Sequence, residues 1–199
     1  MKTVVITGSA RGFGYAMLEL FRKKDFNVVL CDINEEALKF AESKLEIIKS
    51  EGRIFKYKVD ITKEDEVKNL IEDLLTHTET IDIWINNAGV NQPNKPIWEI
   101  DKNVINRLIE IDLKGTILCS KLIMNTMIKQ GSGQIYNVEG HGSNDATITG
   151  LSLYGTSKRA ITYFTEALAH EAKEKNTGVL IGKITPGIMI TNFIETSLG

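Results

Sequence analysis

The stretch Thr3-Val4-Val5-Ile6-Thr7-Gly8-Ser9-Ala10-Arg11-Gly12-Phe13-Gly14 determines which fold the rest of the chain can adopt. Its first five residues are mostly β-branched, which is typical of a strand buried on both faces of a parallel sheet. Three glycines follow, and residues 15–24 carry apolar side chains at helical spacing. A second apolar strand, residues 27–31, ends at Asp32. This order predicts the strand, tight turn, helix and strand of a dinucleotide-binding unit.

The glycines suit a turn that holds phosphate. A helix that begins directly after a strand presents unpaired N–H groups and its positive dipole end to a ligand above the sheet. Side chains at Gly8, Gly12 or Gly14 would obstruct the turn, the approach of the phosphates or the packing of helix on strand. The spacing is G-x-x-x-G-x-G, and a flexible helix N-terminus is the alternative interpretation of the glycines alone.

Asp32 predicts which dinucleotide binds. An acid at the end of the second strand, about 20 residues past the glycines, lies where the adenosine ribose binds in such folds. A carboxylate there accepts from both ribose hydroxyls and repels a 2′-phosphate, which favours NAD over NADP. Arg11 in the loop argues weakly for NADP, because a guanidinium could pair with that phosphate. We expect Asp32 to decide, since it contacts the hydroxyls directly.

The rest of the chain continues the alternation of strand and helix. Further strands are expected over residues 53–59, 81–85, 135–140 and 179–185, and helices over 34–50, 62–75 and 152–175. Thr62 with Asp65 is close to a capping box. The pattern predicts an α/β fold: a Rossmann-like, doubly wound parallel sheet flanked by helices on both faces, in three layers. We expect residues 1–199 to form a single NAD(P)-binding domain.

Composition argues against several other classes of protein. The formal net charge is -2, with acids and bases interspersed, so no basic face for nucleic acid stands out. No apolar run approaches the roughly 20 residues of a membrane span, and the early first strand leaves no room for a signal peptide. Cys31 and Cys119 lie in apolar segments and are expected to be reduced core residues. We therefore expect a cytoplasmic protein without a metal site, a membrane partner or a nucleic-acid partner.

Further motifs follow in a fixed order: Asp60-Ile61, Asn86-Asn87-Ala88-Gly89, Tyr154-Gly155-Thr156-Ser157-Lys158, and Pro186-Gly187 with Thr191. With the glycine loop, they make the chain resemble the short-chain dehydrogenase/reductase family along nearly its whole length. The resemblance implies an NAD(P)-dependent oxidoreductase that transfers hydride between nicotinamide and a carbonyl or secondary alcohol of a small molecule. The cofactor contacts that it implies are Gly8, Ser9, Arg11, Gly12, Phe13, Gly14, Asp32, Ile33, Asp60, Ile61, Asn87, Ala88, Gly89, Tyr154, Lys158, Pro186, Gly187 and Thr191.

Each motif alone also has a simpler interpretation. Asp60 could cap the helix that follows it, and residues 86–89 could form an ordinary turn. Pro186-Gly187 could likewise be a turn after the sixth strand. Only the order and spacing of the motifs together favour the cofactor site.

Tyr154 and Lys158 carry the expected chemistry, because residues four apart lie on one helix face. A phenol with a pKa near 10 is a poor acid or base at neutral pH. An ammonium about 4 Å away is worth about 4 kcal/mol at an effective dielectric of ~20, which predicts a pKa of about 7 for Tyr154. By the resemblance, Tyr154 protonates the carbonyl oxygen or deprotonates the alcohol, and Lys158 also holds the nicotinamide ribose. An isolated pair at this spacing would be an ordinary surface contact.

Two positions depart from the family's pattern. The family normally has a serine at the end of the fifth strand, where its hydroxyl polarises the substrate carbonyl, but this chain has Gly140. We expect Ser143 to take that role, with His141 a weaker candidate; the alternative is that Ser143 is a loop residue without a catalytic part. Asp112 replaces the usual asparagine, whose backbone carbonyl is thought to hold a water of the proton relay. The added charge would tend to raise the pKa of Tyr154.

The run from Glu139 to Ser143, with residues 95–99, resembles the family branch that includes chlorophyll b reductases. The chain ends at Gly199, whereas relatives usually continue with a substrate-covering segment and a seventh strand. We therefore expect a C-terminally short domain, which could reflect truncation, a missing C-terminal part or an open site. The alternative function is a non-catalytic NAD(P)-binding regulatory or assembly module. A homo-oligomer, either dimer or tetramer, is expected from the resemblance alone.

Overall fold

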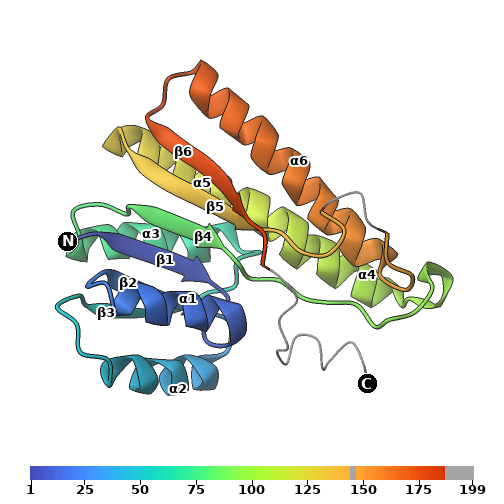
Figure 1. Ribbon diagram of the computed structural model, residues 1–199, viewed down its shortest axis with the longest axis horizontal. Helices are drawn as coiled ribbons and strands as arrows, with labels where there is room; N and C mark the ends of the chain where they lie inside the picture. Colours follow the sequence, from blue (N-terminus) through green and yellow to red (C-terminus); the bar gives the residue numbers. More distant parts are fainter. Residues whose placement is uncertain (144–146, 187–199) are drawn as a thin grey trace.

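The computed structural model describes residues 1–143 and 147–186. These residues form a six-stranded parallel sheet in the order β3-β2-β1-β4-β5-β6. The strands are β1 Thr3–Thr7, β2 Asn27–Asp32, β3 Ile54–Lys58, β4 Ile83–Asn86, β5 Gly133–Val138 and β6 Val179–Ile184. Strand order reverses between β1 and β4, so a ligand crevice is expected at their carboxyl ends. The predicted doubly wound α/β fold is confirmed (Figure 1).

Helices connect the strands in the predicted alternation. They are α1 Gly12–Arg22, α2 Glu35–Glu46, α3 Glu64–His77, α4 Lys102–Leu108, α5 Thr116–Gln130 and α6 Ser152–Glu174, with a short 3-10 turn η1 Ile97–Glu99 and a π-helical segment η2 Ile109–Gly115. In the described part of the chain, no helix combines the length and the apolar character that crossing a membrane requires.

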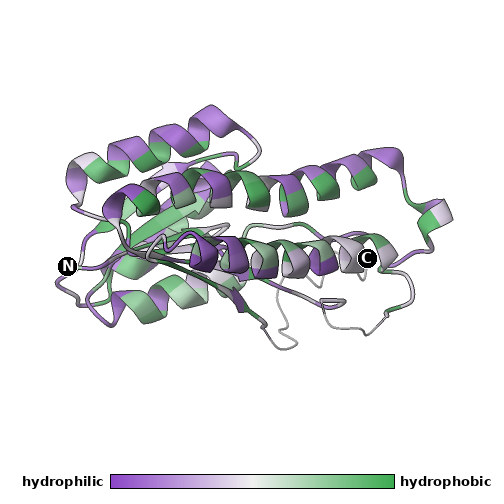
Figure 2. Cartoon of the chain, turned by 90° about the horizontal axis from the view of Figure 1, so that it is seen from above, coloured by the Kyte–Doolittle hydropathy of each residue, from purple (hydrophilic) through white to green (hydrophobic). Residues whose placement is uncertain are grey.

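Two apolar cores lie on opposite faces of the sheet. One packs α1 and α2 against β1 and β2, around Leu18, Leu38 and Ile6. The other packs α3, α5 and the end of α6 against the opposite face, around Trp84 and Ile123. The sheet is mostly apolar, whereas the helices carry both hydrophilic and hydrophobic residues (Figure 2). These two layers of helices fix the sheet as a rigid base for the residues at its carboxyl edge.

The start of α3 differs from the predicted capping box at Thr62 and Asp65. The helix begins at Glu64, its N-cap is Lys63, and Asp65 lies within its first turn. The Thr62 hydroxyl instead donates to Asp60 Oδ1 at 2.7 Å. Because that hydroxyl is used in a turn before the helix, the Thr62 capping box is wrong.

The π-helical segment η2 joins α4 to α5, and two of its residues, Asp112 and Gly115, are buried. Asp112 at its centre is fully buried. A Cβ at Gly115 would lie 2.7 Å from Ile61 Cδ1, so this end of η2 packs closely on the chain after β3. Single π-helical turns often occur at functional sites, and this one places a charged side chain behind the carboxyl edge of the sheet.

Candidate active site

The glycine loop leaves α1 open toward the crevice. Gly12, the first residue of α1, has φ +58°, and a Cβ there would meet no atom of the described residues within 4 Å. Gly8 has φ +62°, and a Cβ there would lie 2.7 Å from Ala88 Cα. A Cβ at Gly14 would lie 2.6 Å from Gly8 O. The loop is therefore tightly packed at Gly8 and Gly14 and open at Gly12. An open N-terminus of α1 fits a pyrophosphate.

Asn87 and Thr7 join the glycine loop to β4. The Thr7 hydroxyl accepts the N–H groups of Asn87 and Ala88, each at 3.0 Å. The Asn87 amide donates to Thr7 O at 2.9 Å and to Gly8 O at 3.0 Å. Asn87 thus fixes the loop, while Ala88 and Gly89 supply small residues beside it. The contribution of Thr7 was not predicted, because a threonine at a strand end has no distinctive sequence signal.

Asp32 lies directly beside the loop at the end of β2. Its Oδ2 accepts from Ala10 N at 3.3 Å and its Oδ1 from Asn34 N at 3.1 Å. Ser9 is buried, and its hydroxyl accepts from Cys31 N at 3.0 Å, so Ser9 fastens the loop to β2. Each oxygen of the Asp32 carboxylate has a second lone pair, which a ribose hydroxyl can use.

The other predicted cofactor residues divide by exposure. Arg11 and Ile33 are exposed at the edge of this region, and Phe13 packs against the core under α1 and α2. Ile61 is buried against η2, and Asp60 Oδ1 accepts from Thr62 N at 2.9 Å. Pro186 is the last described residue of its motif; Gly187 and Thr191 lie outside the described residues.

Tyr154 and Lys158 lie together on the buried face of α6, as predicted. Only 8% of Tyr154 and 6% of Lys158 is exposed, and Lys158 Nζ is 5.5 Å from the centroid of the Tyr154 ring. A Cβ at Gly140 would collide with the Tyr154 hydroxyl and approach Lys158 Cε at 3.3 Å. Gly140 therefore faces the pair directly, and a larger residue there would need the pair to move.

Asp112 joins this group from η2. Its Oδ1 accepts from Val90 N at 2.7 Å, and its Oδ2 lies 3.7 Å from Lys158 Nζ. Within the described part of the chain, Oδ2 accepts no hydrogen bond. A Cβ at Gly89 would lie 3.3 Å from Asp112 Oδ1, so residues 87–89 contact both the glycine loop and the catalytic group. The two predicted clusters therefore meet at the end of β4.

Burial and the Asp112 carboxylate raise the pKa of Tyr154 above its ordinary value. Burial also raises the pKa of Asp112, although the nearby Lys158 ammonium lowers it. The predicted value of about 7 for Tyr154 is therefore not what the structure gives. That prediction considered only the Lys158 ammonium. In the structure this ammonium is paired with Asp112, and Tyr154 and Lys158 are both buried away from water.

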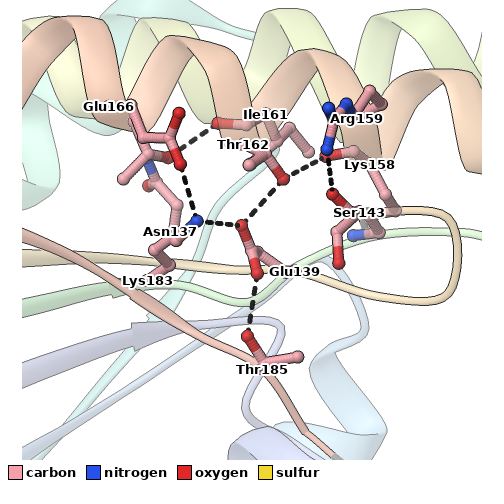
Figure 3. Close-up of polar contacts among 11 residues, drawn as sticks. Asn137, Glu139, Ser143, Lys158, Arg159, Ile161, Thr162, Glu166, Lys183 and Thr185 are labelled. Atoms are coloured by element: carbon pink, nitrogen blue, oxygen red, sulfur yellow. Dashed lines mark hydrogen bonds and ion pairs between the residues drawn. The ribbon is translucent and has the colours of Figure 1, made fainter. Parts of the chain in front are cut away.

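The backbone of Ser143 makes two hydrogen bonds, one to Gly140 and one to the Arg159 side chain. Ser143 N donates to Gly140 O at 3.1 Å. Ser143 O accepts from Arg159 Nη1 of α6 at 2.8 Å (Figure 3). Ser143 is buried, whereas His141 is exposed. Ser143 is thus the more buried of the two candidates, and its predicted role stays a prediction.

Gln92 positions the start of α6 and was not predicted. The residue is 1% exposed, and its Oε1 accepts from Tyr154 N at 2.7 Å. Its Nε2 donates to Gly150 O at 2.8 Å. Because Gln92 and Tyr154 are 62 residues apart, only the path of the loop after β4 brings them together. No local sequence pattern carries that information.

Comparisons with known proteins agree with this geometry. A family model described as short chain dehydrogenase matches residues 2–197. The uncharacterized oxidoreductase YxbG of Bacillus subtilis is 33% identical over 198 residues, which cover 100% of this chain and 70% of that protein. The chlorophyll(ide) b reductase NOL of Arabidopsis thaliana is 31% identical over 196 residues, covering 96% of this chain and 56% of that protein. The chain thus spans little more than half of this reductase, and the predicted likeness to the branch is confirmed.

Solved structures also resemble the chain closely. An NAD+-bound xylitol dehydrogenase has a TM-score of 0.88 at 27% identity, covering 97% of this chain and 72% of that one. ElxO with NADP bound has a TM-score of 0.88 at 26% identity, covering 99% and 77%. Similar structures therefore hold either nicotinamide dinucleotide.

Proposed function

The chain belongs to the short-chain dehydrogenase family, and on that premise we propose that it uses NAD to interconvert a carbonyl and an alcohol, with Tyr154 transferring the proton. As a member of this family it is an NAD(P)-dependent oxidoreductase acting on CH-OH or C=O groups. The observation that carries the proposed roles is the buried Tyr154–Lys158 pair facing Gly140. The comparisons give no support to the alternative of a non-catalytic module.

The residues at the crevice fit a nicotinamide dinucleotide. The loop from Gly8 to Gly14 and the open N-terminus of α1 would hold the pyrophosphate, and Asp32 would hold the adenosine ribose. When bound, the nicotinamide supplies or takes up the hydride. Preference for NAD is supported by the position of the Asp32 carboxylate beside the loop, where it would repel a 2′-phosphate.

The proton passes through Tyr154 Oη in this proposal. A raised pKa keeps the phenol protonated at neutral pH, so the side chain is ready to donate to a carbonyl oxygen. In the oxidation direction the same oxygen must first lose its proton. The charge state of the site therefore favours carbonyl reduction near neutral pH. Lys158, paired with Asp112, would hold the nicotinamide ribose next to Tyr154.

Ser143 is proposed to polarise the substrate carbonyl. Its loop is fixed to Gly140 and to Arg159, and its buried position supports a role at the site. The missing side chain at Gly140 lets the Tyr154 hydroxyl approach the end of β5, and Ser143, three residues further along the chain, is the nearest serine in the sequence. The substrate is proposed to be a small molecule with a carbonyl or secondary alcohol group.

A homo-oligomer, as a dimer or tetramer, is also proposed. It is supported by apolar side chains exposed on the helices that follow β4 and β5, including Ile117, which is 37% exposed, and Tyr163, which is 76% exposed. Cytoplasmic placement is supported by Cys31 and Cys119, which are free thiols buried in the core.

Nucleotide titration combined with one conservative variant tests the proposed function. Binding of NADH and of NADPH is followed by the fluorescence of the two tryptophans, and turnover is measured on a panel of carbonyls and alcohols. We expect tighter binding of NADH. Tyr154→Phe should lower turnover by about 10²–10⁴-fold, because it removes the proton donor, and should leave NADH binding unchanged.

Tyr163→Phe is the matched control, because Tyr163 lies on the same helix but is exposed. It should keep its turnover. Full turnover in Tyr154→Phe would contradict the role of Tyr154, and equal binding of the two nucleotides would contradict the role of Asp32. Failure to bind either nucleotide would overturn the proposed function.

A further inference from the structure

Glu139 is a buried carboxylate at the end of β5, directly before Gly140. It is 5% exposed, although acidic residues are rarely buried unless they are paired. Its Oε1 accepts from Thr162 Oγ1 at 2.7 Å, and its Oε2 accepts from Thr185 Oγ1 at 2.8 Å (Figure 3). Lys183 Nζ lies 3.5 Å from Oε1. Both oxygens are therefore satisfied, and the predicted site gave this residue no role.

The three partners of Glu139 come from two different elements. Thr162 lies on α6, whereas Lys183 and Thr185 lie at the carboxyl end of β6. The backbone also pairs here, because Glu139 N donates to Ile184 O at 2.9 Å. One side chain thus ties the ends of β5 and β6 to α6. A buried carboxylate without these partners would be strongly unfavourable, so the contacts hold the three elements in one arrangement.

The contact with Thr162 reaches the catalytic pair. The same Thr162 hydroxyl lies 3.0 Å from Lys158 O, one turn earlier on α6. On the other side, Gly140 follows Glu139 and faces Tyr154 and Lys158 so closely that a Cβ there would lie 3.3 Å from Lys158 Cε. The separation between the end of β5 and the neighbouring turn of α6 therefore determines where the Tyr154 hydroxyl lies.

Given the proposed function, we propose that Glu139 is a positioning residue: it sets the position of Tyr154 and Lys158 by tying α6 to the carboxyl ends of β5 and β6 through Thr162 and Thr185. Glu139 acts through the position of the helix and contacts neither reactant. Small displacements of a proton donor lower the reaction rate strongly, since a misplacement of about 1 Å can reduce it about 10²-fold. A rigid support for the reacting groups is consequently part of the site.

Thr162→Val and Glu139→Gln test this role. Thr162→Val keeps the shape of the side chain and removes the hydroxyl that joins Glu139 to α6, whereas Glu139→Gln removes the charge. We expect each to lower kcat about tenfold. Thr162→Ser should restore kcat, because it returns the hydroxyl. Glu166→Gln is the control: Glu166 also lies on α6 and pairs with Lys183 at 2.8 Å, but it is exposed and makes no contact with Glu139 in the described structure.

A second readout separates this proposal from the proposed function. The chain has five tyrosines, so ¹³Cζ-labelled tyrosine gives few NMR signals, and the signal of Tyr154 is the one missing in Tyr154→Phe. Thr162→Val and Glu139→Gln should shift that signal, and Glu166→Gln should not. This arm needs no substrate, so it remains decisive if the carbonyl panel shows no turnover.

The two variants also distinguish positioning from general stability. A lower Tm with kcat within twofold of wild type and an unmoved Tyr154 signal would overturn the proposal. If Glu139→Gln does not fold, the near-isosteric Thr162→Val decides the question. Loss of kcat that Thr162→Ser restores, with a shifted Tyr154 signal, would support it.

Discussion

The nucleotide half of the site, residues 3–32, and the catalytic half, residues 133–186, position their groups in different ways. In the nucleotide half the contacts described above involve backbone groups: Ser9 with Cys31 and Ala10 with Asp32, each 22 residues apart, and Asn87 with Thr7 and Gly8, 80 and 79 residues apart. In the catalytic half, Tyr154 N is held by a glutamine 62 residues away, and Glu139 is held by a threonine 46 residues away. The first half is therefore set mainly by contacts of the backbone, and the second to a larger extent by contacts between polar side chains of different elements.

This difference predicts opposite weaknesses in the two halves. Gly8 and Gly14 in the nucleotide half lie against backbone atoms, so an added methyl group has no space at these two positions. The catalytic half is held by hydrogen bonds inside the protein, so a lost polar group leaves its partner unsatisfied. Substitutions that add volume should mainly affect cofactor binding. Substitutions that remove a polar group should mainly affect turnover.

Removing the Ser143 hydroxyl should have the largest effect among the substitutions that separate the two halves. If Ser143 polarises the carbonyl, Ser143→Ala should lower kcat by about 10²-fold, which is typical for the loss of one oxyanion donor. NADH binding should stay within about twofold, because the glycine loop is untouched. Ser152→Ala is the control, since Ser152 is exposed at the start of α6. Turnover within twofold of wild type would mean that Ser143 is only a loop residue.

The glycine turn and the place of Asp32 beside it could be predicted from the sequence because that information is local. The spacing of Gly8, Gly12 and Gly14 requires a tight turn, and an acid at the end of the next strand has one place to lie. The motif at Tyr154 and Lys158 was also recognisable, because residues four apart share a helix face whatever surrounds them. The alternation of strands and helices, which follows from periodicity alone, gave the fold.

The remainder depended on how distant segments pack. Gln92 and Thr162 have no distinctive spacing, and their contacts exist only because loops and helices meet at the carboxyl edge of the sheet. The departure at Asp112 was visible in the sequence, but its pairing with Lys158 was not. Burial of Tyr154, together with the nearby Asp112 carboxylate, raises the pKa of Tyr154, and this is why the predicted lowering of that pKa was wrong.

Adding one methyl group should have opposite effects at Gly14 and at Gly155. A Cβ at Gly14 would lie 2.5 Å from Asn87 Nδ2 and 2.9 Å from Ser9 Cα, so Gly14→Ala must displace the loop. Overpacking of this kind costs about 1–3 kcal/mol, and we expect NADH affinity to fall by more than about tenfold. Fluorescence titration measures the affinity, and thermal unfolding measures the stability.

Gly155→Ala is the matched change on α6. A Cβ there would meet only Gly142 Cα among the described atoms, at an ordinary 3.8 Å. In a helix interior alanine is favoured over glycine by about 0.5–1 kcal/mol, so this variant should have a slightly higher Tm. A Tm decrease in Gly155→Ala as large as that of Gly14→Ala would contradict the proposed difference between the halves.

Asp112→Asn should move the pH dependence of turnover without abolishing it. Burial is the larger cause of the raised pKa of Tyr154, and the Asp112 carboxylate is the smaller one. Asp112 also pairs with Lys158. Removing its negative charge should therefore lower the pKa of Tyr154. Alcohol oxidation requires the deprotonated phenol, so its rate should rise at lower pH in the variant than in wild type. Carbonyl reduction requires the protonated phenol and should start to fall at a correspondingly lower pH.

The rate of alcohol oxidation from pH 6 to 10, which rises with pH below the raised pKa of Tyr154, measures this shift, and Glu110→Gln is the control. Glu110 lies on the same η2 segment, but its side chain is only half-buried and paired with Lys114 at 2.6 Å, so the profile should not move. An unchanged profile in Asp112→Asn would show that the carboxylate does not act on Tyr154, and that the geometry of η2 alone matters. A shift toward higher pH would reverse the sign expected from the charge. Either result would contradict an electrostatic effect of Asp112 on Tyr154. The catalytic half would then depend on Asp112 only through its packing.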